Sequence, residues 1–409
     1  MKKNILSIFI FLLALCVVGQ NNPTPAKVFS CPQILKASDS KFSLFSAKAY
    51  KIDLICSPVG SGVEKEVESS VASEYYFEKE HNVAWIKFTA AESSKLTISI
   101  APKSSKDDYD FLLFKEDGID SKAKIASKEL KPIRSNIART MDINNGLTGL
   151  TFDAKNLFMS EGVKSGFSKY IEVKENENYY LVLDNVYDNG QGAIITFNYF
   201  ETKSINGIVT DENKKPVAAQ VTWEETSTGE ELAKTTSDPV TGVFKLDVPY
   251  NKDQLGKYIL STESDGFFYN EVTYTSNEIS SCPPTPIRVV LPELKLGKRT
   301  TLNNINFEGG VALFLPTAKP SLERLAKLMK KNPRLKILIE GHTNGCPGNS
   351  QELSEHRALA VKNYLVKNKI SADRINTIGL NCEFMLYPLT SNEGKQSLNR
   401  RVEIVVEDY

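Results

Sequence analysis

One basic residue near the C-terminus stands on the predicted apolar face of a helix. Arg357 lies four residues after Leu353 and four residues before Val361, a spacing that places all three on the same side of an α-helix. A guanidinium that faces a core needs an anion, because an unpaired buried charge is costly. Two interpretations stay open from these residues: Arg357 binds an external anion, or it pairs internally with a glutamate such as Glu340 or Glu403.

The loop that precedes this helix carries further polar residues. Asn344 lies just beyond a predicted strand, where open α/β sheets place their ligands. Cys346 follows it, and Cys382 follows a different predicted strand. Neighbouring strand ends bring such residues together, so we predict a Cys346–Cys382 disulfide that stabilises the loop by roughly 3–4 kcal/mol. His342 has no nucleophile or acidic partner at motif spacing, and we expect it to order the loop rather than to catalyse.

The elements that position these residues alternate regularly over 302–409. Apolar residues recur at helical spacing within 320–333 and again within 353–365. Short apolar runs predict strands at 304–307, 335–339, 374–378 and 402–406. The order β-α-β-α-β-β predicts a two-layer α/β sandwich.

Four ordered motifs in this segment resemble the C-terminal peptidoglycan-binding domain of the OmpA-like family, namely Gly341–Asn344, Leu353–Ala358, Asp373–Ile375 and Asn399–Glu403. The resemblance implies that Arg357 grips a carboxylate of the diamino acid in the peptidoglycan stem peptide. Family members usually have an Asp, which holds the ammonium group of that diamino acid, where this chain has Asn344. A charge-assisted hydrogen bond is roughly twice as strong as a neutral one. We therefore expect weakened peptidoglycan binding, or a different preferred stem-peptide residue.

The same resemblance assigns roles to further residues. It implies that Arg400 is a second cation of the pocket and that Thr343 and Ser350 add polar contacts. His342 and Asn399 are expected to support the loop structurally. The three histidines of the chain find no set of metal ligands at motif spacing, so no metal site and no cofactor are predicted here.

Residues 24–200 read as an all-β domain. Strand-like alternation recurs at 83–88, 96–100, 111–114 and 193–197, and the apolar run 179–183 predicts a buried strand. This segment resembles the jelly-roll modules of secreted Bacteroidetes proteins, of the pre-peptidase C-terminal type, through residues 84–89 and 107–114. The carboxylates of Asp107, Asp108 and Asp110 suggest a calcium site, because hard cations prefer clustered oxygens. The alternative is a solvated entrance to a strand.

Residues 203–292 form a second predicted β domain. Its ordered pieces, at 205–211, 219–223, 238–242 and 243–249, resemble the carboxypeptidase-regulatory-like, transthyretin-like β-sandwich. Such modules act as spacers or binding platforms. Residues 293–301 are polar and basic and are predicted to be a linker. The whole chain is thus predicted to contain two all-β sandwich domains followed by the α/β domain at 302–409.

The first residues indicate export. Residues 1–19 have a basic start and a short apolar run, which predicts a signal peptide. Of six cysteines, Cys16 lies within this segment, where Leu15 departs from the small residue that lipoprotein signals require. In an oxidising compartment Cys31 and Cys56 are a natural pair, which leaves Cys282 odd.

Composition limits the possible functions. Lys plus Arg and Asp plus Glu both number 50, which argues against a nucleic-acid partner. No catalytic constellation stands at motif spacing, so a wall hydrolase or secreted peptidase is disfavoured. We predict a non-catalytic periplasmic protein that binds peptidoglycan and anchors an outer-membrane or secretion-associated assembly. By analogy of architecture, its partners would belong to a type IX secretion or gliding system. The alternative is an interaction module that has lost wall binding.

Overall fold

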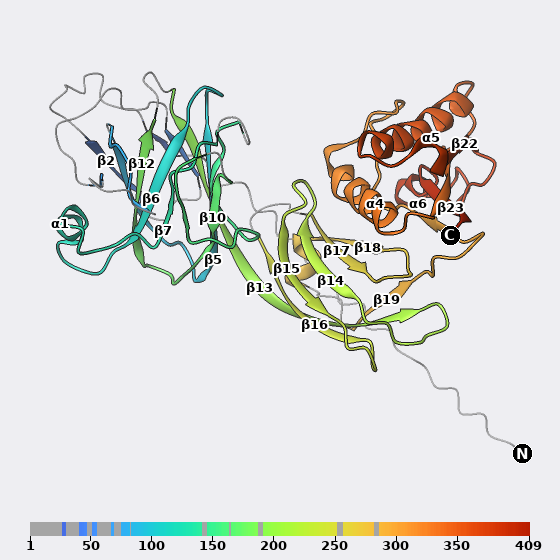
Figure 1. Cartoon of the computed structure of the whole chain (residues 1–409), viewed down its shortest axis with the longest axis horizontal. Coiled ribbons are helices and arrows are strands. Elements are labelled where there is room, and N and C mark those ends of the chain that lie inside the picture. Colours follow the sequence, from blue (N-terminus) through green and yellow to red (C-terminus); the bar gives the residue numbers. More distant parts are fainter. Residues whose placement is uncertain are drawn as a thin grey trace, which may run out of the picture.

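The computed structural model describes residues 27–29, 41–46, 51–54, 67–68, 75–81, 83–140, 145–162, 165–186, 191–251, 257–281 and 286–409. The molecule is mostly β-sheet, and its helix-rich part is C-terminal (Figure 1). None of the described helices is both long and apolar enough to cross a membrane. The predicted signal peptide and the residues Cys31, Cys56 and Cys282 lie outside the described residues.

Two sheets share one core in the N-terminal part. The first contains β1 (Lys27–Phe29), β3 (Lys51–Leu54), β5 (Ser94–Pro102), β8 (Thr148–Thr151), β10 (Phe167–Lys169), β11 (Ile171–Val173) and the start of β13 (Ala193–Asp211). The second contains β2 (Lys41–Ser46), β4 (Val83–Thr89), β6 (Tyr109–Lys115), β7 (Arg134–Asn136), β9 (Phe158–Met159) and β12 (Asn178–Asn185). Alternate residues of β4, β5, β6, β12 and β13 meet between the sheets. These five predicted strands are all present, and the short helix α1 (Ser121–Ala126) was not predicted.

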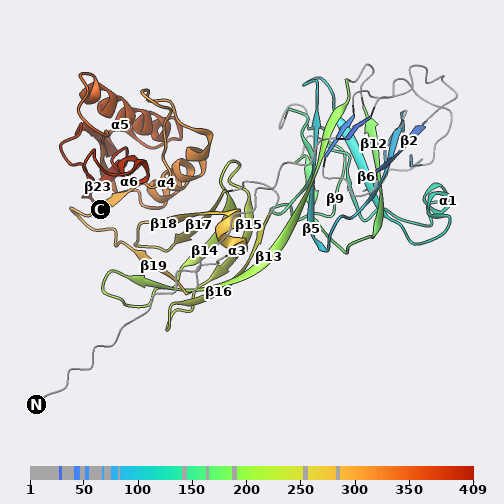
Figure 2. The same cartoon turned by 180° about the vertical axis from the view of Figure 1, so that it is seen from behind.

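Strand β13 belongs to two parts of the molecule at once. Its first residues, 193–200, pair with β5, and residues 201–208 pair with β16 (Val243–Tyr250). Every second residue is buried from 193 to 199 and again from 205 to 211, in the same phase, whereas residues 201–204 between them are part-exposed or exposed. The boundary predicted between 200 and 203 therefore falls inside a continuous strand, which is visible in Figures 1 and 2.

The middle part is a second two-sheet arrangement. Strand β13 lies between β16 and β19 (Ile287–Leu291), opposite a sheet of order β15-β14-β17-β18. That sheet consists of β14 (Gln220–Glu225), β15 (Glu231–Thr236), β17 (Lys257–Glu263) and β18 (Asn270–Thr275), and helix α3 (Ser276–Ser281) follows it. Trp223 stacks on Tyr258 at 5.1 Å between ring centroids in the shared core.

The C-terminal part is a two-layer α/β sandwich. Its sheet has the order β20-β23-β21-β22, formed by β20 (Arg299–Thr301), β21 (Lys336–Gly341), β22 (Ile375–Gly379) and β23 (Val402–Asp408). Apolar residues of β21 and β23 pack with α4 (Lys319–Lys331) and α5 (Ser350–Lys367). Short helical turns lie at η1 (Pro316–Ala318), η2 (Ala372–Arg374) and α6 (Glu393–Ser397).

The first strand of this part was predicted at the wrong place. Residues 304–307 form no strand; Phe307 makes only an isolated bridge to Phe314. The strand is instead β20, inside the predicted linker 293–301. It pairs with β23 alone, at the edge of the sheet, and its sequence Arg-Thr-Thr has no apolar alternation to identify it.

Helix α4 meets the middle part through a buried basic residue. Arg324 is 7% exposed and its Nη2 donates to Glu224 Oε2 at 2.8 Å. Its Nε lies 3.3 Å from Glu271 Oε1 and 3.7 Å from Glu263 Oε1. Three carboxylates of the middle sheet thus surround one guanidinium of the C-terminal part. Ser321 Oγ also donates to Glu271 Oε2 at 2.7 Å.

Candidate functional site

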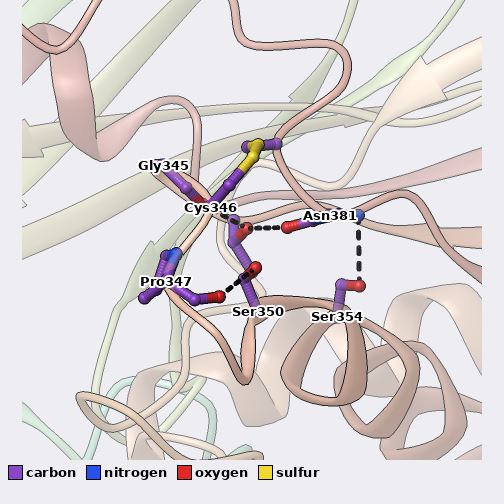
Figure 3. Close-up of a disulfide and its surroundings, with 8 residues drawn as sticks. Gly345, Cys346, Pro347, Ser350, Ser354 and Asn381 are labelled. Atoms are coloured by element: carbon purple, nitrogen blue, oxygen red, sulfur yellow. Dashed lines mark hydrogen bonds between the residues drawn. A yellow bond between two sulfur atoms is a disulfide. The ribbon is translucent and has the colours of Figure 1, made fainter.

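Helix α5 packs directly against the end of strand β21. A Cβ atom at Gly341 would lie 2.1 Å from the carbonyl oxygen of Ser354, so only glycine permits this approach. The hydroxyl of Ser354 accepts a hydrogen bond from Asn381 N at 3.2 Å, which connects the loop after β22 to the helix (Figure 3). Both strand-end loops are therefore held against the first turns of α5.

A disulfide joins the same two loops. Cys346 and Cys382 are bonded, with Cα atoms 5.4 Å apart, as Figure 3 shows. This confirms the predicted pair. The hydroxyl of Thr343 donates to the carbonyl of Gly345 at 3.0 Å, and the hydroxyl of Ser350 donates to the carbonyl of Pro347 at 2.6 Å. Both hydrogen bonds stabilise the loop that precedes α5. Both residues are buried, and neither lines the pocket described below.

Arg357 is buried without a carboxylate partner among the described residues. The residue is 5% exposed; its Nε lies 3.3 Å from Val311 O and its Nη2 lies 3.4 Å from Glu308 O. The guanidinium carbon is 5.1 Å from the centre of the Phe307 ring. Burial and the neighbouring Arg400 lower the pKa of Arg357. Two long bonds to backbone carbonyls leave most of the positive charge unbalanced.

The internal pairing considered for Arg357 is wrong. Glu340 accepts from Arg299 Nη2 at 2.9 Å, and Glu403 accepts from Arg401 Nε at 2.9 Å. Burial opposes the ionisation of Glu403, but contacts with His342 and Arg401 lower its pKa to about 2. Both glutamates therefore have other cations. His342, expected to have no acidic partner, lies 3.3 Å from Glu403.

A pocket of about 500 Å³ brings Arg357 and Arg400 together. Arg400 is part-exposed and its Nη2 pairs with Glu393. Apolar side chains of Phe307, Leu386 and Leu398 share the wall, and no acidic side chain lines it. Arg401 also lines the pocket, so three guanidinium groups and, among the described residues, no carboxylate line it. This makes the pocket suitable for an anion, because hydrogen bonds to ionised acceptors are the strong ones.

Asn344 does not line this pocket. Its Oδ1 accepts from Asn399 Nδ2 at 2.8 Å, and its Nδ2 donates to Gln396 Oε1 at 2.9 Å. Asn399 is fully buried, and its Oδ1 accepts from the backbone nitrogens of Leu386 and Tyr387. The predicted supporting role of Asn399 thus has a structural counterpart. Asn344 and Asn399 together fix the segment that carries the wall of the pocket.

Sequence reasoning missed several residues of the site. The carbonyls at Glu308 and Val311, the ring of Phe307 and the amide of Gln396 belong to no motif. Leu386 and Leu398 are 53% and 51% exposed, and such exposed leucines mark a surface site. This signal is available only once the fold is known.

The three aspartates suggested for calcium diverge. Asp107 accepts from Gln191 N, Asp108 accepts from the backbone and hydroxyl of Thr140, and Asp110 lies opposite Asp184 across β6 and β12. Within the described residues they form no group whose ligand atoms converge on one point. Asp110 instead faces a pocket with His81, whose Nδ1 contacts Asp184 at 2.8 Å.

Comparison with known proteins identifies the class of the C-terminal part. Residues 306–399 match the model of the OmpA family, so this part is an OmpA-family domain. The peptidoglycan-binding protein ArfA of Mycobacterium tuberculosis is 31% identical over 179 residues, covering 42% of this chain and 53% of that protein. The probable lipoprotein YiaD of Escherichia coli is 31% identical over 106 residues, or 25% of this chain and 48% of that protein. The chain spans about half the length of these curated relatives.

Solved structures include a putative MotB-like protein from Desulfovibrio vulgaris. It is 27% identical, with a TM-score of 0.25, over 27% of this chain and 74% of that chain. An outer membrane protein from Borrelia burgdorferi is 34% identical, with a TM-score of 0.20, over 26% of this chain and 85% of that chain.

Proposed function

We propose that the C-terminal domain binds peptidoglycan non-catalytically, by holding a carboxylate of the stem peptide on Arg357 and Arg400. The observation that carries the proposal is the buried guanidinium of Arg357. Its only hydrogen-bond partners in the described residues are two backbone carbonyls, at 3.3 and 3.4 Å. A carboxylate would accept a two-pronged hydrogen bond from Arg357 and balance its charge. The similarity to a protein named for peptidoglycan binding supports this ligand class.

The whole chain then acts as an anchor in the cell envelope. The two β-rich parts would face an outer-membrane or secretion-associated partner while the C-terminal domain holds the wall. Support comes from relatives named as a lipoprotein and as outer membrane proteins. A periplasmic location, export by residues 1–19 and partners of type IX secretion or gliding type remain parts of this proposal, as do the jelly-roll and carboxypeptidase-regulatory-like assignments.

The test is retention of the full chain on purified sacculi. We expect Arg357→Ala to reduce retention by roughly 10-fold or more, since losing a buried charge-assisted pair costs about 1.5–3 kcal/mol. Arg334→Ala, an exposed arginine of the same domain, removes the same charge and should leave retention unchanged. Arg357→Lys keeps the positive charge but loses the two parallel N–H donors of the guanidinium group. Intermediate retention of this variant would indicate that Arg357 binds a carboxylate through two hydrogen bonds. Equal retention of wild type and Arg357→Ala, with both folded, removes Arg357 from the site.

A second candidate is an interaction module without wall binding. It is favoured by Asn344, whose amide is engaged by Gln396 and Asn399 instead of facing the pocket. Asn344→Asp decides between the two: stronger retention on sacculi indicates that this position reaches the ammonium group of the stem peptide. Unchanged retention by a wild type that does bind restricts Asn344 to positioning. No retention of either form supports the interaction module.

A further inference from the structure

Three buried side chains converge on the sheet face that α4 and α5 leave uncovered. Glu340 and Glu403 stand opposite each other across β21 and β23. Their neighbours Ile339 and Ile404 point into the helix-covered core, so the glutamates point the other way. His342 follows Glu340 by two residues, and one ligand atom from each of the three lies within 4.8 Å of the other two.

These side chains carry buried polar atoms that lack a hydrogen bond from any described residue. His342 is 1% exposed, Glu340 4% and Glu403 8%. Glu340 Oε2 and both ring nitrogens of His342 are buried and make no hydrogen bond. His342 Nε2 lies 3.3 Å from Glu403 Oε2, within ion-pair distance. Each buried polar group without a partner costs about 1–3 kcal/mol, and an ion is one of the few things that relieves several at once.

Arginines hold one oxygen of each carboxylate closely, and Arg299 Nε also lies 3.7 Å from the second oxygen of Glu403, Oε2. Arg299 Nη2 holds Glu340 Oε1 at 2.9 Å, and Arg401 Nε holds Glu403 Oε1 at 2.9 Å. Thr301 Oγ1 also donates to Glu403 Oε1, at 3.2 Å. Glu403 Oε2 is also the oxygen nearest to the imidazole of His342, and Glu340 Oε2 has no hydrogen bond within the described residues. Such outer contacts orient ligands in metal sites and fix which oxygen faces the ion.

We propose that Glu340, His342 and Glu403 form a binding site for a divalent transition-metal ion, of which Zn²⁺ fits best. One imidazole nitrogen and two carboxylate oxygens are ordinary zinc ligands, and three protein ligands leave a fourth position for water. Mg²⁺ and Ca²⁺ prefer more oxygens and no nitrogen. None of the three residues lines the anion pocket, but the two sites are neighbours, because Thr301 and Arg401 contact Glu403 and also line that pocket. A bound ion would stabilise the end of β21 two residues before Asn344.

The charge around the site sets its strength. Two glutamates already face two guanidinium groups, Arg299 and Arg401, so an incoming cation gains less attraction than in a purely acidic site. The competing arrangement is a protonated His342 that bridges the two glutamates without any metal. Arg299 is 57% exposed at its side chain, and its charge is therefore screened by solvent. Selective uptake of zinc separates the two arrangements.

The experiment is calorimetric titration of ZnCl₂ into chelator-treated full chain, prepared without a histidine tag. We expect about one equivalent to bind to wild type, and His342→Ala and Glu340→Gln to bind roughly 10–100-fold more weakly or not at all. His356→Ala is the matched control, because His356 is an exposed histidine of the same domain. His81→Ala excludes the pair of His81 and Asp184 as the origin of the signal.

Two results overturn the proposal. Wild type that takes up no zinc at saturable stoichiometry shows that His342 is a bridge only. Loss of binding in His356→Ala or His81→Ala, with His342→Ala unaffected, places the metal elsewhere. Cobalt loading of wild type keeps the test decisive when variants at the buried cluster fail to fold. A tetrahedral Co²⁺ absorption spectrum that zinc abolishes supports the site, and its absence refutes it.

Discussion

Replacing Arg324 by methionine should uncouple the middle part from the C-terminal domain. Methionine retains the apolar packing of the stem but removes the cation that faces Glu224, Glu263 and Glu271. Glu224 and Glu271 are 8% and 5% exposed, so neither carboxylate regains full hydration. Burial already raises the pKa of Glu224. The variant therefore tests whether one buried guanidinium holds the two parts together.

The expected loss in the free energy of unfolding is about 3–5 kcal/mol, the usual cost of removing one partner of a buried ion pair. It depends on pH in a definite direction. Without the attraction of Arg324, the pKa of Glu224 in the folded state rises further above its unfolded value. The folded form then becomes less stable as pH increases and Glu224 ionises, so the loss is largest near pH 8 and smaller near pH 5.

Urea denaturation of the full chain measures this loss, since guanidinium chloride would screen the charges. Tryptophan fluorescence reports the two β-rich parts, through Trp85 in the N-terminal part and Trp223, stacked on Tyr258, in the middle part. Circular dichroism in the far ultraviolet follows the helices of the C-terminal domain. Lys331→Met is the control: its pair with Asp265 is exposed and contributes at most about 1 kcal/mol. If Arg324→Met loses no more stability at pH 8 than Lys331→Met, the buried network is not what joins the parts.

Three further predictions concern single positions. Burial raises the pKa of Glu230 to about 7, so wild-type stability should fall by at most about 3 kcal/mol as pH rises from about 4.5 to 7, and urea titrations of Glu230→Gln should lack this slope; an unchanged slope refutes the assignment. Replacing Cys346 and Cys382 by serine should cost roughly 3–4 kcal/mol in the same assay, and two free thiols in native wild type would contradict the bond. Gly341→Ala should cost about 3 kcal/mol or more because a Cβ atom collides with α5, whereas Gly348→Ala, with open space around it, should be neutral; equal melting temperatures would disprove the close contact.

Much of the fold follows from periodicity, and its exceptions have physical reasons. Strands β4 and β5 were predicted because alternate residues bury against one core. Helices α4 and α5 were predicted because apolar residues recur on one side. Strand β20 was missed because an edge strand of three residues needs only backbone pairing to β23, and no apolar pattern. Helix α6 is too short for a periodic signal.

The site was predictable only in part, because its contacts join distant positions. The spacing around Arg357 correctly indicated a cation on the buried side of the helix. It did not reveal that Glu340 and Glu403 are held by Arg299 and Arg401. Asn344 was recognised as unusual, but its partners lie 52 and 55 residues further along the chain. No local pattern encodes such pairings.

The continuous strand β13 gives the molecule a mechanical property. Its 19 residues extend over about 60 Å, and hydrogen bonds to β5 in one half and β16 in the other secure both ends. A flexible tether between two modules would first uncoil under tension, whereas this strand has no slack to release. If the C-terminal domain is fixed and a load acts on the N-terminal sheets, force passes along the backbone of β13 and shears its ladders in parallel. The chain would then behave as a rigid rod. The distance that it spans would be fixed by the folded structure and not by the entropy of a flexible linker.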